Sequence, residues 1–230
     1  MKKVLKISIL LMAAALFFAG CSNSSGGDSG DSSGGGSGGS NNKTFAAPKT
    51  NANIDATEVD LSDGVWHIDS YSKQIMTMPA AMAAMGGSTS NEPQVSEMLM
   101  HIEMTVNGDD VEVTKATQTV KSNGQVVEED ITNEMKQAYK DKATAEDPSN
   151  SGASDSELAQ MGITVDASKI NPQVTCKKDS NNTEFFATVD VNFKLGDVIT
   201  IDPSNPNSAL FMMMADMTMK QHTDVLYKKQ

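Results

Sequence analysis

Arginine is absent from this 230-residue chain: its 18 basic residues are all lysines, against 30 acidic residues, and the net charge is −12. Arginine is the side chain that grips phosphate and carboxylate groups with two parallel hydrogen bonds. Cationic side chains also supply most of the affinity of proteins for nucleic acids. We therefore expect no nucleic acid among the partners of this chain.

Cysteine is almost as scarce, because the chain has only Cys21 and Cys176. A disulfide framework is thus excluded, and the fold must be stabilised by a hydrophobic core. Residues 58–230 are numerous enough for one such core, and nothing in their composition marks a second domain. Cys176 lies two residues after Val174 in an alternating run, so we expect its thiol to be buried and unreactive.

Catalytic and metal-binding patterns are also few. The three histidines, His67, His101 and His222, show no spacing typical of a zinc site. His67 and His101 precede Asp69 and Glu103 by two residues, an arrangement that solvated strand faces often produce by chance. A G-x-S-x-G pattern at 35–39 lies in Gly/Ser-rich sequence without the strand and helix that a nucleophilic serine needs. We expect no enzyme activity, no cofactor and no metal.

The first twenty residues have the layout of a secretory signal. Lys2, Lys3 and Lys6 form a basic start, and the apolar stretch from Val4 to Ala19 is too short for a confident membrane span. This pattern predicts export of the chain.

The end of that stretch, Phe18-Ala19-Gly20-Cys21, resembles a bacterial lipobox in which Phe18 stands where leucine is usual. The resemblance implies a signal peptide (1–20) that is cut before Cys21 and a Cys21 thiol that carries palmitate or a similar acyl chain. Two or three such chains anchor a protein durably in the lipid bilayer. Ser22 follows, and in lipoproteins of two-membrane bacteria a residue other than Asp there implies the outer membrane. We expect a monomer anchored in a bacterial membrane, with the outer membrane favoured.

Residues 21–57 form a predicted tether. Its Gly26–Asn42 part consists almost entirely of Gly, Ser, Asp and Asn, which bury too little apolar surface to offset the entropy of ordering. The folded domain is then expected at 58–230.

Within 58–230, alternating or β-rich runs recur between turn signals. They cover 65–75, 98–106, 111–121, 125–135, 173–178, 184–195, 197–201, 211–221 and 223–228, with tight turns at 107–109, 122–124, 179–182 and 195–197. This pattern predicts an all-β fold, an up-and-down antiparallel barrel of about eight strands. A β-sandwich of similar strand count remains the alternative.

Short helices are expected at 79–85 and 154–161, while 136–154 fits either a helix or an acidic surface loop. The first begins at Pro79, ends at Gly86-Gly87 and places Met78, Met82 and Met85 on one face.

The Gly64-x-Trp66 start, the long insertion after the first strand and the final Tyr227-Lys228-Lys229 resemble bacterial lipocalin-like lipoprotein domains. The resemblance covers most of 58–230. It implies a barrel whose floor is plugged by Trp66 and whose mouth is covered by the first long loop. Lipocalins pack an arginine across that tryptophan, so here Lys220 or Lys228 would take its place.

Methionine is unusually frequent: the chain has 16, of which Met1 and Met12 lie in the signal. Met98, Met100 and Met104 share one strand face, and so do Met213, Met217 and Met219. These side chains could line a pliable apolar cavity, ligate cuprous ion or simply fill the core. The candidate ligand-binding residues are Trp66, Met82, Met85, Met98, Met100, Met104, Phe185, Val189, Phe193, Met217 and Met219.

Two functions fit these features. In the first, the barrel carries a small apolar ligand. In the alternative, the barrel is packed solid, and its outer surface binds a protein or glycan in adhesion or assembly. The content of the interior distinguishes the two.

Overall fold

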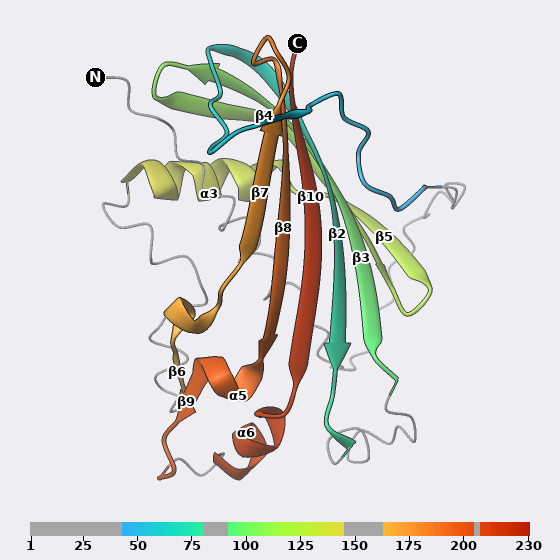
Figure 1. Ribbon diagram of the computed structural model, residues 1–230, viewed down its shortest axis with the longest axis vertical. Helices are drawn as coiled ribbons and strands as arrows, with labels where there is room; N and C mark the ends of the chain where they lie inside the picture. The colour runs from blue at the N-terminus through green and yellow to red at the C-terminus, as the bar shows by residue number, and fades with distance from the viewer. Residues whose placement is uncertain (1–42, 81–91, 145–162, 205–207) are drawn as a thin grey trace, which may run out of the picture.

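The computed structural model describes residues 43–80, 92–144, 163–204 and 208–230 (Figure 1). An antiparallel sheet of eight strands in the order β1-β7-β8-β10-β2-β3-β4-β5 dominates it, so the prediction of an all-β fold is confirmed. These strands are β1 (Ile54–Asp55), β2 (Gly64–Thr77), β3 (Gln94–Asn107), β4 (Asp110–Ser122), β5 (Gln125–Asp130), β7 (Gln173–Lys178), β8 (Glu184–Lys194) and β10 (Thr218–Lys229).

Smaller elements complete the described part of the chain. β6 (Ile163–Val165) and β9 (Ile199–Ile201) form a separate two-stranded sheet. The helical elements are α3 (Thr132–Thr144), the 3₁₀ turn η1 (Ala167–Lys169), α5 (Leu195–Val198) and α6 (Ser208–Met214). In Figure 1, α3 crosses the strands near one end of the sheet, while α5 and α6 lie beyond the opposite end of β8 and β10. No helix of the described residues is long and apolar enough to cross a membrane.

The strand order is that of an up-and-down meander, but the sheet is open. β2 to β5 follow one another as neighbours, and the last strand, β10, pairs with the first long strand, β2. The described strands β1 and β5 lie at opposite edges and do not pair with each other. The predicted barrel closure is therefore not observed.

The predicted strand 125–135 ends early, at Asp130. The backbone N–H of Thr132 donates to the carboxylate of Asp130 (2.9 Å), and the Ala116 N–H donates to the Thr132 hydroxyl (2.9 Å). These bonds turn the chain from β5 into α3. The helix then packs on the sheet through Met135 and Tyr139 instead of extending the edge strand.

The tight turns were largely predictable. Asn123 and Gly124 have φ values of 51° and 78°, as a two-residue hairpin turn requires, and Gly108 has a φ of 62°. The turn expected at 195–197 is instead the short helix α5.

The predicted strand 211–221 is wrong in its first half. α6 occupies Ser208–Met214, and β10 begins only at Thr218, so Met213 does not share a strand face with Met219. Single-sequence alternation did not distinguish this methionine-rich helix from a strand. The helix expected at 79–85 lies largely outside the described residues, and the one at 154–161 lies entirely outside them.

One face of the sheet, which we call the core face, carries the hydrophobic core. Its buried side chains are Trp66, Ile68, Ile102, Met104, Val106, Val113, Ala116, Cys176, Phe185, Ala187, Val225 and Tyr227. The predicted alternation in β3 and β8 is confirmed, because Met104 and Phe185 both point to this face and are almost fully buried.

Trp66 lies at the centre of the core and is fully buried. Its indole N–H donates to the Ser62 carbonyl (2.7 Å), and its ring centroid lies 6.1 Å from that of Phe185. The cation beside it is Lys229, whose ammonium lies 6.0 Å from the ring centroid. The prediction of Lys220 or Lys228 is wrong because strand alternation places both of them on the opposite face.

The opposite face, which we call the polar face, is crossed by an extended segment that we call the strap (residues 43–53, blue in Figure 1). At its start the Lys43 ammonium lies 2.7 Å from the Glu128 carboxylate and donates to the Thr119 hydroxyl (3.1 Å). Near its end the Thr50 hydroxyl donates to Glu184 (2.6 Å). Contacts with the sheet thus begin at Lys43, earlier than the domain boundary expected at residue 58.

Glu184 fastens the strap although it is only 6% exposed. Burial acts to raise the pKa of this carboxyl, but bonds from the Thr50 hydroxyl and the backbone N–H groups of Asn51 and Ala52 outweigh it, so the pKa is lowered. Glu184 therefore stays ionised beneath the strap at neutral pH.

Tyr227 provides a test of the core. Its side chain is fully buried, and its hydroxyl has no hydrogen-bond partner among the described residues. An unpaired buried hydroxyl costs about 1–3 kcal/mol. We expect Tyr227→Phe to raise the free energy of unfolding in urea by up to about 1 kcal/mol, because the phenyl ring keeps the packing and removes the penalty.

The matched control is Tyr71→Phe on the polar face, where the hydroxyl donates to Glu97 (2.9 Å). This variant should lower the free energy of unfolding. A loss of more than about 1 kcal/mol in Tyr227→Phe would contradict the assignment of an unpaired hydroxyl.

Candidate binding groove on the polar face

The described residues among those predicted to line a ligand cavity separate into two groups by burial. Trp66, Met104, Phe185 and Val189 are at most 2% exposed and belong to the packed core. Core filling, one of the three readings of the methionines, therefore describes Met104. The others that the structure describes are only half-buried: Met98, Met100, Phe193, Met217 and Met219. Met82 and Met85 lie outside the described residues.

A small polar cluster interrupts the core face beside these half-buried side chains. The Ser72 and Thr223 hydroxyls are 3.0 Å apart, and the Gln221 amide donates to both at 3.2 Å. Gln221 is 4% exposed, and its Oε1 has no partner among the described residues. An amide oxygen in this position can accept one further hydrogen bond.

The polar face carries all three histidines, and two of them have the same surroundings. The His101 ring nitrogens lie 2.7 Å from Asp69 on the neighbouring strand and 3.3 Å from Glu103 on its own strand. This confirms the expected His101–Glu103 pair on one strand face. Each ring nitrogen of His101 thus faces one carboxylate.

His222 repeats this arrangement on β10. Its Nδ1 lies 2.7 Å from Asp190 of β8, and its Nε2 lies 3.0 Å from Asp224. Partial burial acts to lower the pKa of His222, but the hydrogen bonds and charges of Asp190 and Asp224 outweigh it, so the pKa is raised. The two carboxylates thereby favour the imidazolium form of His222 relative to a free histidine.

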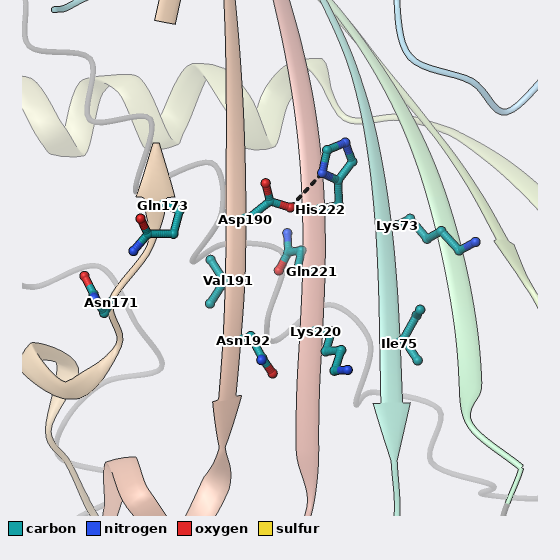
Figure 2. A pocket seen from close by; sticks show the side chains of 10 residues that line it. All are labelled: Lys73, Ile75, Asn171, Gln173, Asp190, Val191, Asn192, Lys220, Gln221 and His222. Carbon is teal, nitrogen blue, oxygen red and sulfur yellow. Dashed lines mark hydrogen bonds and ion pairs between the residues drawn. The ribbon is translucent and has the colours of Figure 1, made fainter. Parts of the chain in front are cut away.

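A groove of about 450 Å³, which we call the polar groove, extends from His222 over four strands (Figure 2). Carboxamides stand at its β7 and β8 side, the Asp190–His222 pair lies at its middle, and Ile75 of β2 lies at its other side. The lining residues are Lys73, Ile75, Asn171, Gln173, Asp190, Val191, Asn192, Lys220, Gln221 and His222.

Lys220 is one of the basic side chains that line this groove. Its register partners are Asn192 on one side and Ile75 on the other, so neither neighbour offers a carboxylate. Among the described residues, Lys220 forms no ion pair, in contrast to Lys43 and Lys121, which are paired with glutamates. Its charge is thus available to a ligand.

A second groove of about 480 Å³ lies under the strap. Its floor includes Leu99, His101 and Leu226, and Lys43 and Lys49 of the strap stand at its edge. Both grooves therefore lie on the polar face.

The described residues bring together no group of three His, Cys, Asp or Glu side chains that could hold a metal ion, and the described thiol is buried. Cys176 is 8% exposed, and burial raises the pKa of its thiol, which confirms the expectation of a buried thiol.

The sequence did not predict the polar groove, although part of the signal was present. The alternation of β8 places Asp190 and Asn192 on its polar side, and His222 is followed two residues later by Asp224. Bringing these strands together required the register of β8 against β10, which local alternation does not specify. Asn171 precedes β7 and carries no periodic signal at all.

In comparisons with known proteins, no family profile matches the chain, and no characterised protein matches its sequence.

The His222 cluster predicts a pH-dependent contribution to stability. Because the pKa of His222 is raised in the folded state, its stabilising effect is fully present below the unfolded pKa of about 6.5 and is lost as the pH rises through the folded value. Asp190→Asn removes one carboxylate. We expect a lower His222 pKa in an NMR titration and a loss of stability that is larger at pH 5.5 than at pH 9, where the imidazole is neutral.

The control for this substitution is Asp109→Asn, in the exposed turn between β3 and β4. Asp109→Asn removes the same charge at a position far from β10 in sequence, so the His222 pKa should not change. An unchanged His222 pKa in Asp190→Asn would contradict the pairing.

Proposed function

We propose that this chain is a membrane-anchored, non-catalytic module that binds a protein or glycan on the polar face of its sheet. The observation that carries the proposal is the polar groove, a hollow of about 450 Å³ that offers amide, imidazole and ammonium groups. Convergent polar groups in a concave site are what fixes and orients a ligand. The buried core lies on the opposite face, so these exposed groups are not needed for packing.

The packing of the core face supports a surface-binding module over a carrier. Where a lipocalin-like barrel would hold its ligand, Trp66, Met104 and Tyr227 are fully buried, and Met135 and Tyr139 of α3 pack against them. Protein interiors of this kind are close-packed and leave few voids larger than water. A ligand would have to displace this core, whereas the polar groove needs no rearrangement.

The lipid anchor at Cys21 is the second part of the proposal and rests on the resemblance of residues 18–21 to a lipobox. Residues 22–42 would then separate the anchor from the strap. A Gly/Ser-rich chain of this length has an average reach of about 25 Å. Since the strap lies on the polar face, the tether would leave the domain from the face that binds the ligand. The membrane that we propose for the anchor is the outer membrane.

A carrier of a small apolar ligand remains the second candidate, because the core face is not packed uniformly. Met98, Met100, Phe193 and Met219 are half-buried, and the unpaired Oε1 of Gln221 lies on the same face. Methionines adapt to irregular apolar ligands.

One experiment separates the two candidates. The experiment compares two double variants. The first, Asn192→Ala/Lys220→Ala, alters the polar groove. The second, Met98→Ser/Met219→Ser, alters the half-buried part of the core face. The module predicts that the first pair weakens retention on an immobilised oligosaccharide and peptide array at least tenfold and that the second pair has no effect. It also predicts little binding of a fluorescent fatty acid to any variant.

Tight fatty-acid binding that is lost only in Met98→Ser/Met219→Ser would support the carrier and refute the module. Far-ultraviolet circular dichroism of both variants provides the control for folding.

A further inference from the structure

We propose that the ligand of the polar groove is an acidic saccharide, that is, one whose sugars carry carboxylate or phosphate groups. This inference rests on the proposed function and assigns the chemical class of the ligand. It follows from the juxtaposition of three carboxamides with a lysine that has no carboxylate partner among the described residues.

The carboxamides favour a hydroxyl-rich ligand. Asn171, Gln173 and Asn192 are all exposed and line the same side of the groove. A carboxamide offers both a donor and an acceptor, which matches a sugar hydroxyl that donates and accepts. Three carboxamides in the lining of one groove can bind several hydroxyls of one saccharide chain.

The charge at the other side favours an anion. Lys220 stands between Asn192 and Ile75 in the register of the sheet, and the acid nearest by register, Asp190, is already bonded to His222. Lys194, on the next strand, is paired with Asp216 at 2.6 Å. In a chain with 30 acidic and 18 basic residues, an ammonium group without such a pair is a local positive site.

The other two basic side chains of the groove, Lys73 and His222, already interact with carboxylates. In Figure 2 the Lys73 side chain extends away from β10, and its charge acts on Glu97. Both ring nitrogens of His222 are already bonded to carboxylates, those of Asp190 and Asp224. Lys220 is therefore the group expected to meet the anion, and the apolar side chain of Ile75 beside it can contact the carbon–hydrogen face of a sugar ring.

The test compares trigalacturonate with its methyl ester, which keeps the sugar chain and removes the negative charges. We expect the acid to bind at least ten times more tightly than the ester by biolayer interferometry. The preference should decrease between 50 and 500 mM salt, because exposed charges are screened. Lys220→Met keeps an apolar stem without the charge and should abolish the preference.

The matched control is Lys177→Met, which removes the same charge from an exposed position of the polar face outside both grooves. It should retain the preference for the acid. A parallel series with phosphorylated dextran and plain dextran distinguishes phosphate from carboxylate as the anionic group. The inference is supported if the wild-type protein prefers either charged saccharide over its uncharged form and Lys220→Met removes that preference.

Other outcomes overturn it in distinguishable ways. If acid and ester bind equally and Asn192→Ala weakens both, the module stands and the acidic class is wrong. If only polyglutamate binds, with loss in Lys220→Met, the ligand is an acidic peptide and the saccharide class is wrong. If no saccharide or peptide binds, both this inference and the proposed function fail.

Discussion

The pairing of β10 with β2 is the constraint on which the rest of the structure depends. It joins the β2–β5 meander to the β7–β8 hairpin and makes one sheet out of the two ends of the domain. Because side chains alternate along a strand, the same register places Tyr227 beside Ile68 in the core and His222 beside Lys73 on the polar face. A slip by one residue would exchange these faces and expose the core. The hydrophobic core and the polar groove are thus two consequences of one register.

The two faces then differ in what they can do. The core face buries Trp66 and Tyr227 under α3, and it ends in the half-buried methionines around Gln221. On the polar face, His101 and His222 are each held by two carboxylates. Such cross-strand pairs each contribute only modestly to stability, so their order matters mainly for presenting the remaining groups to a ligand.

The sequence predicted the features that depend on the local pattern of residue types, namely strand faces and a hairpin turn. Alternation identified the buried faces of β3 and β8, and Asn123-Gly124 identified a hairpin, because a period of two and a positive φ leave direct signals in the residue types. It did not predict that β5 would end at Asp130, because bonds of Thr132 to Asp130 and Ala116 turn the chain there, or that Ser208–Met214 would be helical. The polar groove was missed for a related reason: its members come from four strands, and only the register of distant segments brings them together.

NMR can measure directly which face of the sheet binds the ligand. Amide chemical shifts of the ¹⁵N-labelled protein, recorded during titration with trigalacturonate, report which face meets the ligand. Shifts concentrated at Gln173, Asn192, Lys220 and His222, with Met98 and Met100 unmoved, are the predicted result. Shifts confined to the core-face methionines, or none at saturating ligand, would contradict a binding site on the polar face.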